Sequence, residues 1–325
     1  MPKLYWTPLH TRLHKTLRLR RSLLPAGSRV LIAVSGGQDS LCLGKLLLDL
    51  SSKWHWYLAI AHCDHQWSTD AGIARRVAEV AESWQLPFYL KTADNLKETE
   101  AAARKWRYQA LVEIAGEVGF KYIVTGHTKS DRAETLLYNL IRGAGTDGLA
   151  ALDWQRSLTK EITLIRPLLN VYRQETLSFC QQFDLPIWFD KVNENNKYAR
   201  NRIRHSLIPY LQDNFNPQVE KSLAQTAQLL KDDVEYLEAI ASKLLKTAKK
   251  DNKLSRPVLR NVPLAIQRRA IRQFLPSIIG KQPNFEQIEA VIKLIDAPNK
   301  SRTSTLPGGA IAEVEKDWIV FNPQE

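Results

Sequence analysis

Short apolar runs alternate with longer segments of helical periodicity over roughly the first 200 residues. The apolar runs are rich in aliphatic and β-branched side chains, as strands buried on both faces are. Strands separated by helices pair in parallel, because each helix returns the chain to the same edge of the sheet. The pattern therefore predicts an α/β fold with a doubly wound parallel sheet, whose strands are 30–34, 57–61, 87–93, 121–127 and 161–169.

The pattern changes after the segment LIPYL, where strands give way to helices. A long helical segment covers 217–250, two shorter ones follow, and a proline-glycine-glycine turn at 307–309 predicts a terminal β-hairpin. A chain of 325 residues can bury more than one core. We therefore expect a Rossmann-like domain over 1–212 and a smaller, mainly helical domain over 213–325.

The first predicted strand runs into six small polar residues: Ser35, Gly36, Gly37, Gln38, Asp39 and Ser40. Glycines let a backbone approach phosphate closely, and the amide groups at the start of a helix hold the anion. The lysine of the kinase-type loop GxxxxGK is absent, and the acid Asp39 stands in its place. An acid beside phosphates is tolerated when it holds a hydrogen-bond donor or a cation such as Mg²⁺. The loop therefore predicts an ATP site that grips pyrophosphate and suits cleavage between the α- and β-phosphates.

Polar clusters also follow two other predicted strands. His62 and Asp64 end the second strand, and Gly126 and His127 end the fourth. Ligands of doubly wound sheets bind beyond the carboxyl ends of the strands, so we expect both clusters at the nucleotide site. His62, Asp64 and His65 also have a spacing that metal ligands use, which is the alternative for that segment.

The chain carries a formal net charge of +12. A basic surface beside a nucleotide site indicates a polyanionic partner, of which nucleic acid is the simplest, and the alternative is that the charge serves solubility alone. The three cysteines, Cys42, Cys63 and Cys180, form no CxxC pair and no disulfide framework. This pattern suits a reducing cytosol, so we expect a cytoplasmic protein.

The first 38 residues contain no Asp or Glu and several arginines, a composition that organelle transit peptides share. Leu9, Leu13 and Leu17 recur at helical spacing and lead toward the first strand, so we favour an amphipathic helix that belongs to the fold. No apolar run is long enough to span a membrane. The sequence leaves open whether two chains form a homodimer.

The segment SGGQDS matches the SGGxDS signature of the N-type ATP pyrophosphatases, or PP-loop family. Further segments narrow the resemblance because they occur in order: AHCDH, AARKWRY, TGHTKSDRAETLLYNLIRGAGTDGL, LIRPLL and DKVNENNKYARNRIRHSLIPYL. Together they resemble the tRNA(Ile)-lysidine synthase family over about residues 15–215. The remaining chain resembles the second domain of that family. The resemblance implies that 1–212 is the catalytic PP-loop domain and that 213–325 recognises the tRNA substrate.

The resemblance implies a ligase that uses ATP, Mg²⁺ and free L-lysine on a minor isoleucine tRNA with a CAU anticodon. ATP adenylates the 2-oxo group of the wobble cytidine, at position 34 of the tRNA, and pyrophosphate leaves. The ε-amine of lysine then displaces AMP to give lysidine, which pairs with A and switches decoding from AUG to AUA. Negative charge that builds up in both steps requires nearby cations or hydrogen-bond donors.

The resemblance also implies roles for individual residues. Residues 35–40 would hold ATP, with Asp39 as the Mg²⁺ ligand, and four polar residues would line the nucleotide: His62, Asp64, Gly126 and His127. Arg104 and Arg107 share one helix face and would act on phosphates in catalysis; without the resemblance they would be a solvated basic face.

Asp131 and Glu134 lie one helical turn apart and would bind metal, orient the ammonium group of lysine or accept its proton. The alternative is a capping acid and an ordinary helix-face glutamate. A basic run would bind tRNA phosphates, with Lys197 and Tyr198 nearby, or else serve as a basic linker: Arg200, Arg202, Arg204 and His205.

The sequence departs from the family pattern in two places. Gln66-Trp67-Ser68 follow the DH motif where the family usually continues toward an arginine. Ser130 precedes Asp131 where paired acids are usual, which leaves metal binding to Asp39 and Asp131.

Three other functions are alternatives to the lysidine-forming ligase. A PP-loop tRNA thiolase would use cysteines for a sulfur carrier or cluster, and an amidating synthetase would use the cysteine of a glutaminase domain. A non-catalytic RNA-binding protein would not need an intact loop. The intact loop at 35–40, Asp131 and the absence of a CxxC pair favour the lysidine-forming ligase.

Overall fold

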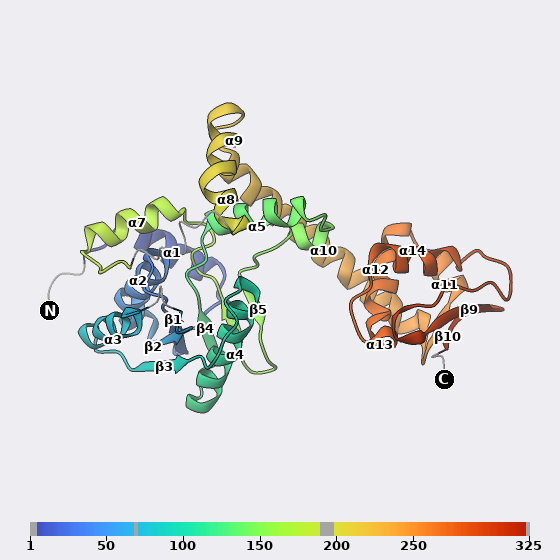
Figure 1. The fold of residues 1–325 in the computed structure, drawn as a ribbon, viewed down its shortest axis with the longest axis horizontal. Coiled ribbons are helices and arrows are strands. Elements are labelled where there is room, and N and C mark those ends of the chain that lie inside the picture. The colour runs from blue at the N-terminus through green and yellow to red at the C-terminus, as the bar shows by residue number, and fades with distance from the viewer. Residues whose placement is uncertain (1–4, 68–70, 189–197, 323–325) are drawn as a thin grey trace. The chain divides into compact units, whose positions relative to one another are not determined.

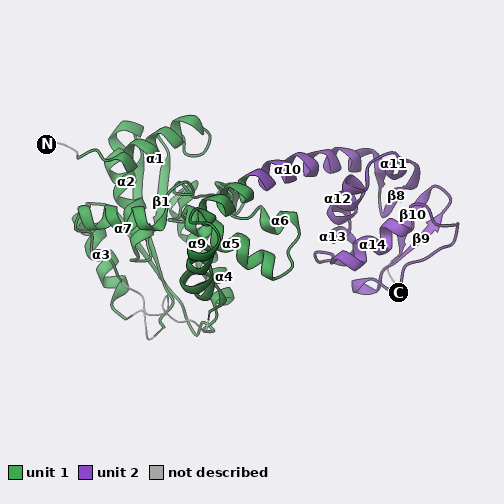
Figure 2. Cartoon of the chain, turned by 90° about the horizontal axis from the view of Figure 1, so that it is seen from above, with its two compact units in different colours: residues 1–228 green, residues 229–325 purple. Residues whose placement is uncertain are grey.

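The computed structural model describes residues 5–67, 71–188 and 198–322. The chain forms two compact units, 1–228 and 229–325 (Figure 2). The break between them lies within helix α10 (Val219–Ala248), further along the chain than the boundary after residue 212 that the composition suggests. Each unit has its own hydrophobic core, as independent domains require.

The first unit is built on a six-stranded sheet with the order β3-β2-β1-β4-β6-β5 (Figure 1). Five strands are parallel and correspond to the five predicted ones, which confirms the doubly wound fold: β1 (Arg29–Ala33), β2 (Tyr57–Asp64), β3 (Phe88–Thr92), β4 (Tyr122–Val124) and β6 (Thr163–Ile165). The sixth strand, β5 (Gln155–Ser157), pairs antiparallel with β6. All of its residues are exposed, so no apolar pattern marks it in the sequence.

Helices cover both faces of this sheet, because side chains along each strand point alternately to two cores. One core is built on α4 (Glu100–Val118) and receives Leu31 of β1. The other receives Val30 and Ile32 and is built on four helices: α1 (Pro8–Leu19), α2 (Gln38–Trp54), α3 (Ile73–Ser83) and α7 (Arg173–Gln182).

The N-terminal helix is part of this core. Leu9, Leu13 and Leu17 of α1 are each at most 7 % exposed, as expected for an amphipathic helix that belongs to the fold. No helix in the described ranges combines the length and the apolar character that a membrane crossing requires.

The strand order reverses between β1 and β4. From β1 the chain adds β2 and β3 on one side and then crosses to place β4 on the other side. Doubly wound sheets bind ligands in the crevice at such a reversal, beyond the carboxyl ends of the strands. The glycine loop 35–40 follows β1 and residues 125–128 follow β4, so the topology brings both polar segments to this crevice.

The rest of the first unit consists of short helices around a small apolar cluster. Leu137 packs there with Ile203 and Ile208, which places the predicted basic run beside α5. The elements are α5 (Lys129–Ile141), α6 (Thr146–Leu149), α8 (Ala199–Arg202), the π-helical turn η3 (Ile203–Leu207) and α9 (Ile208–Asn214).

The second unit combines helices with an antiparallel sheet of order β7-β8-β10-β9. Its helices are α11 (Arg256–Arg260), α12 (Leu264–Phe274), α13 (Pro276–Ile279) and α14 (Phe285–Lys293), with the 3₁₀ turn η4 (Pro307–Gly309). Its strands are β7 (Lys249–Lys250), β8 (Lys253–Ser255), β9 (Ile311–Glu315) and β10 (Trp318–Asn322).

The predicted hairpin exists, but its predicted turn position is wrong. Strands β9 and β10 join at Lys316 and Asp317, whereas the glycine segment forms η4 ahead of β9. Lys316 adopts a φ of +55°, which a lysine occupies less readily than a glycine. The glycines mark a turn, yet the turn that closes the hairpin carries no glycine.

Candidate active site

The glycine loop after β1 has the geometry of an anion site. Gly36 has a φ of +86°, and a Cβ atom there would lie 3.1 Å from Ile73 Cγ2, so the position favours glycine. Gly37 is the N-cap of α2 and provides no side-chain cap, which leaves the first amide groups of this 17-residue helix available to an anion. Ser40 Oγ donates to the Gly37 carbonyl at 2.9 Å and accepts from the Ser35 amide at 3.2 Å, which fixes the loop.

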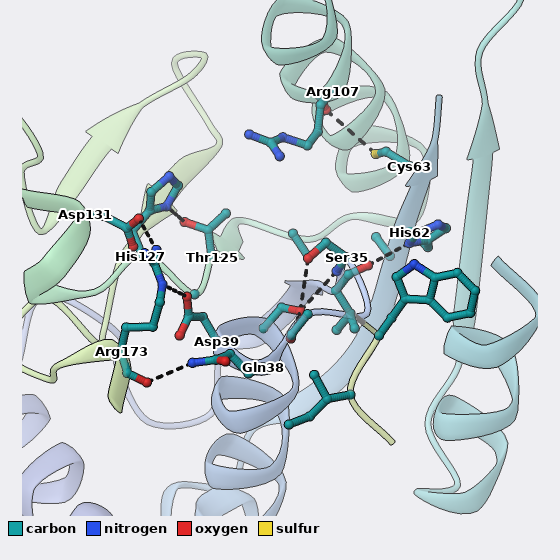
Figure 3. A pocket seen from close by; sticks show the side chains of 18 of the residues that line it. Ser35, Gln38, Asp39, His62, Cys63, Arg107, Thr125, His127, Asp131 and Arg173 are labelled. Atoms are coloured by element: carbon teal, nitrogen blue, oxygen red, sulfur yellow. Dashed lines mark hydrogen bonds and ion pairs between the residues drawn. The ribbon is translucent and has the colours of Figure 1, made fainter. Parts of the chain in front are cut away.

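Gly126 brings the loop after β4 against the glycine loop. A Cβ atom at Gly126 would lie 2.7 Å from the backbone carbonyl of Asp39, so only glycine permits this approach. The loops border a cavity of about 480 Å³ at the carboxyl edge of the sheet (Figure 3). Most predicted site residues line it: Ser35, Gly37, Gln38, Asp39, Ser40, His62, Arg107, Gly126, His127, Asp131, Arg204 and His205. Others lie outside its lining: Gly36, Asp64, Arg104, Glu134, Arg200 and Arg202.

The end of β2 holds its polar side chains through backbone contacts. His62 Nδ1 lies 2.8 Å from the Val34 carbonyl, and Asp64 Oδ1 accepts from the Gln66 amide at 2.8 Å. Among the residues that the structure describes, no group of three or more His, Cys, Asp and Glu side chains is arranged to hold a metal ion. The geometry therefore does not support the metal-site alternative for this segment.

Arg173, the first residue of α7, joins three carboxylates on one side of the pocket. Its Nε donates to Asp39 Oδ2 at 3.1 Å, its Nη2 to Asp131 Oδ1 at 2.6 Å and its Nη1 to Glu134 Oε1 at 2.8 Å (Figure 3 shows the first two acids). Arg204 donates to both oxygens of Glu134, at 2.8 and 2.9 Å. The side chain of Glu134 is only 1 % exposed, and a carboxylate so buried requires such partners. We call these five residues the acid network.

Asp39 and Asp131 differ in their proton affinity. Burial raises the pKa of Asp39, and the opposing effects of Arg173 and Thr176 do not offset it. Burial alone would also raise the pKa of Asp131, but Arg173, His127 and the Thr128 amide hold it well below its usual range. Asp131 is therefore ionised throughout the neutral range, whereas Asp39 gains more from an additional cation.

Asp131 also caps helix α5. Its Oδ2 accepts hydrogen bonds from the backbone amide and the hydroxyl of Thr128, at 2.7 and 2.9 Å. The interpretation as a capping acid is thus confirmed, while the other oxygen binds Arg173. One carboxylate meets both needs because its two oxygens point to different partners.

His127 is neutral at the edge of the acid network. Burial lowers its pKa to about 3, and nearby arginines, Arg166 and Arg107 among them, act in the same direction against Asp131. Its Nδ1 lies 2.9 Å from Thr125 Oγ1. A neutral imidazole held in this way can exchange a hydrogen bond with a nucleotide without adding charge.

A second set of cations surrounds Tyr108 of α4. The guanidinium carbons of Arg104, Arg107 and Arg156 lie 5.2, 5.7 and 4.8 Å from the centre of its ring. We call these four residues the arginine group. Burial lowers the pKa of Arg104, and the nearby charges of Arg107 and Arg200 lower it further. Within the described ranges neither Arg104 nor Arg107 forms an ion pair, and Arg107 extends from α4 toward the pocket (Figure 3). Such a group suits an anionic ligand.

The predicted tRNA-binding run divides into two parts. Arg204 belongs to the acid network, and Arg200 lies 3.6 Å from Glu100 Oε1 and 3.8 Å from Glu134 Oε2. Arg202 and His205 are exposed to solvent. Lys197 lies outside the described residues. Arg200 and Arg204 thus face acids of the protein itself.

Sequence reasoning missed Arg173 and Thr176. Arg173 occupies the first turn of α7, where the helix dipole disfavours a cation, and it follows the last parallel strand. That position could have drawn attention to Arg173, because an arginine in the first turn of a helix is favourable only when acids lie nearby. Thr176 lies one turn further along α7 and donates its hydroxyl hydrogen bond to Asp39 Oδ1.

Mg²⁺ fits Asp39 as an ion that is shared with phosphates. The two carboxylate oxygens of Asp39 accept from Arg173 and Thr176, and each oxygen has a further lone pair. Mg²⁺ in nucleotide sites is commonly held by one or two carboxylates, substrate phosphates and water. The residues present suit an ion of this kind better than a site built from protein ligands alone.

Known proteins resemble this chain both locally and over its length. The PP-loop domain model of the ATP_bind_3 family matches residues 9–211. The tRNA(Ile)-lysidine synthase of Nostoc sp. is 54 % identical, with 98 % of both chains covered. That of Synechocystis sp. is also 54 % identical, with 97 % of this chain and 98 % of the relative covered. A chloroplastic tRNA(Ile)-lysidine synthase from Zygnema circumcarinatum is 38 % identical over 85 % of this chain and 77 % of its own.

A U34-tRNA thiolase from Methanococcus maripaludis, a solved structure with a [4Fe-4S] cluster, shares the fold. Its TM-score is 0.59 at 18 % identity, with 69 % of this chain and 77 % of the thiolase covered. This likeness extends to the fold and no further. The family model covers more than half of the chain, and the relatives match it over nearly the full length, so the chain belongs to the tRNA(Ile)-lysidine synthase family of PP-loop proteins.

Proposed function

We propose that this protein ligates L-lysine to the wobble cytidine of a minor isoleucine tRNA with a CAU anticodon. In the first step the 2-oxo oxygen of cytidine attacks the α-phosphorus of ATP, and pyrophosphate leaves. In the second step the ε-amine of lysine, in its neutral form, attacks C2 of the base, AMP leaves with the former 2-oxo oxygen, and the attacking nitrogen releases one proton to solvent. The observation that carries the proposal is that one pocket combines an open phosphate loop with a paired acid network.

The first step uses the glycine loop and the cations around it. The amides at the start of α2 would bind the phosphates, and Asp39 would share Mg²⁺ with them. Arg107 lines the pocket, and Arg104 lies beside it on the ring of Tyr108. Both would stabilise the charge on the phosphates as the bond between the α- and β-phosphates breaks.

The second step uses the acids of α5. Asp131, which lines the pocket, would orient the ammonium group of lysine. Glu134 is buried and paired with Arg173, Arg204 and Arg200, so it would support Asp131 through the shared Arg173. Asp131 is a poor proton acceptor, since its pKa is held well below the usual range. Of the roles that the sequence left open for Asp131, orientation of the amine therefore fits best.

The basic run supplies the contact to tRNA in this proposal. Arg202 and His205 are exposed, and His205 also lines the pocket, so phosphates of an anticodon loop would pass beside them as its base enters. We place the reaction in the cytoplasm, because all three cysteines are free and buried, as in proteins of reducing compartments.

Mass spectrometry of the tRNA tests the proposal directly. An unmodified isoleucine tRNA transcript with a CAU anticodon is incubated with the protein, ATP, Mg²⁺ and L-lysine, beside a methionine tRNA with the same anticodon. We expect a lysine-sized mass gain on the wobble cytidine of the isoleucine tRNA alone. Release of AMP and pyrophosphate with a different RNA, without that gain, would assign the protein to another PP-loop activity.

A further inference from the structure

Arg173 connects parts of the pocket that the proposed reaction uses at different times. Asp39 belongs to the phosphate loop at the start of α2, whereas Asp131 and Glu134 belong to α5. Each of the three side-chain nitrogens of Arg173 donates to a different one of these acids, at 3.1, 2.6 and 2.8 Å. Arg173 forms no bidentate pair with any one of these acids. Its guanidinium therefore links all three carboxylates to one another.

The backbone of Arg173 makes the same connection. Its amide donates to Ser130 Oγ of α5 at 3.1 Å, and its carbonyl accepts from Gln38 Nε2 of α2 at 2.8 Å. Ser130 stands where the family pattern usually has an acid, and here it anchors the start of α7 instead. Side chain and backbone thus hold the first turns of α2, α5 and α7 in one arrangement.

The surroundings of Arg173 show that its charge is directed at the pocket. The first turn of a helix disfavours a cation, so helix stability does not explain an arginine at this position. The side chain of Arg173 lines the cavity and is partly exposed, whereas the structural arginine Arg256 is buried and binds backbone carbonyls. Removal of Arg173 would leave three carboxylates with Arg204 as their main counter-ion.

We propose that Arg173 is a positioning residue that couples the two steps: it holds Asp39 for adenylation and, through the same guanidinium, holds Asp131 and Glu134 for lysine. The inference rests on the proposed two-step ligation. It predicts that one substitution at Arg173 impairs both steps. Substitutions at the individual acids act on one step each, since Asp39 lies in the phosphate loop and Glu134 lies on α5.

The two steps are measured separately in single-turnover experiments. Formation of adenylated tRNA is followed by pyrophosphate release without lysine, and transfer is followed by lysine addition to preformed adenylated tRNA. We expect Arg173→Ala to slow each step by at least about tenfold. Asp39→Asn slows only adenylation, and Glu134→Gln slows only transfer and raises the KM for lysine.

Double-mutant cycles sharpen the test. If Arg173 acts through these acids, Arg173→Ala adds little to Asp39→Asn in adenylation and little to Glu134→Gln in transfer. Arg173→Lys keeps the charge but cannot reach three acids at once, so we expect partial activity with a raised KM for lysine. Millimolar guanidinium restores part of the rate of Arg173→Ala.

Arg12→Ala is the matched control. Arg12 of α1 pairs with Glu175, which lies on α7 as Arg173 does. Its Nη1 is 2.8 Å from Glu175 Oε2, and both side chains are about one-third exposed. This variant also loses an arginine–carboxylate pair at α7, and we expect both steps to keep their rates without any response to guanidinium.

Several outcomes would overturn the inference. Additive effects in both cycles, a loss confined to one step, or equal losses in Arg12→Ala would each reject the coupling role. If Arg173→Ala lacks a cooperative thermal transition, Arg173→Lys decides, and wild-type kinetics in that variant would reject the proposal. Failure of the wild-type protein to form lysidine would instead reject the proposed function.

Discussion

The acid network and the arginine group differ in whether the protein itself provides the opposite charges that pair with them. In the acid network, three carboxylates are paired with Arg173 and Arg204 through short hydrogen bonds. In the arginine group, guanidinium groups gather around Tyr108, and among the described residues no acid pairs with Arg104 or Arg107. One side of the site therefore has its charges paired within the protein, whereas the proposed function assigns an anionic ligand to the other.

Asp39→Asn is expected to have the largest effect, because it removes both a charge of the acid network and the proposed Mg²⁺ ligand. Lysidine formation should fall by at least about 100-fold, since charge stabilisation of the transition state is lost. Binding of tRNA, measured by filter retention or fluorescence anisotropy, should persist. Near-normal lysidine formation by the variant would remove Asp39 from the chemistry.

Arg107→Ala tests the arginine group. We expect pyrophosphate release to slow by about ten- to a hundredfold, because the arginine of this group that lines the pocket is lost and no acid is freed in exchange. Arg29→Ala is the control, since its guanidinium lies 5.0 Å from the ring of Phe120 at the amino end of β1. Equal losses in both variants would show that the arginines serve only packing on aromatic rings.

Thr176→Val tests how far the acid network depends on neutral donors. The threonine hydroxyl donates to Asp39 Oδ1, while Arg173 continues to bind Oδ2. A loss of about three- to tenfold in adenylation is expected, the value of one hydrogen bond. A loss as large as that of Asp39→Asn would mean that Thr176, and not Arg173, sets the position of the acid.

Arg202→Ala should have the smallest effect on turnover. Arg202 is exposed, whereas Arg204 binds Glu134 of the acid network. The dependence of tRNA affinity on salt should lose about one unit of slope in Arg202→Ala, as for one phosphate contact. Arg204→Ala should instead raise the KM for lysine. An unchanged slope in Arg202→Ala would leave phosphate binding to other residues.

Much of the fold could be predicted because local pattern and global topology agree. Apolar runs such as 30–34 and 57–61 became neighbouring parallel strands, and the glycine loop lies at the reversal of strand order. The edge strand β5 and the hairpin turn at Lys316 could not be predicted. A strand whose residues are all exposed shows no alternation of apolar and polar residues, and a turn without glycine lacks the residue that usually marks one.

The candidate site shows the same division. A glycine beside phosphate or at a close backbone approach has no substitute, so Gly36 and Gly126 stand out in a sequence. An arginine can pair with any acid that folding brings near it, and the residues next to it in the chain do not show which acid that is. Arg173 is 134 residues from Asp39 along the chain, and Arg204 is 70 residues from Glu134.

The sequence by itself determined the order of strands and helices, the phosphate loop and the family, because these depend on local residue patterns. The tertiary structure alone decided which charges pair. It assigned Arg204 to Glu134 instead of solvent, gave Asp131 both a cap and an ion pair, and placed Arg173 among three acids. The physical reason is that pairing energies depend on distance and burial, and folding sets both for residues that lie far apart in the chain.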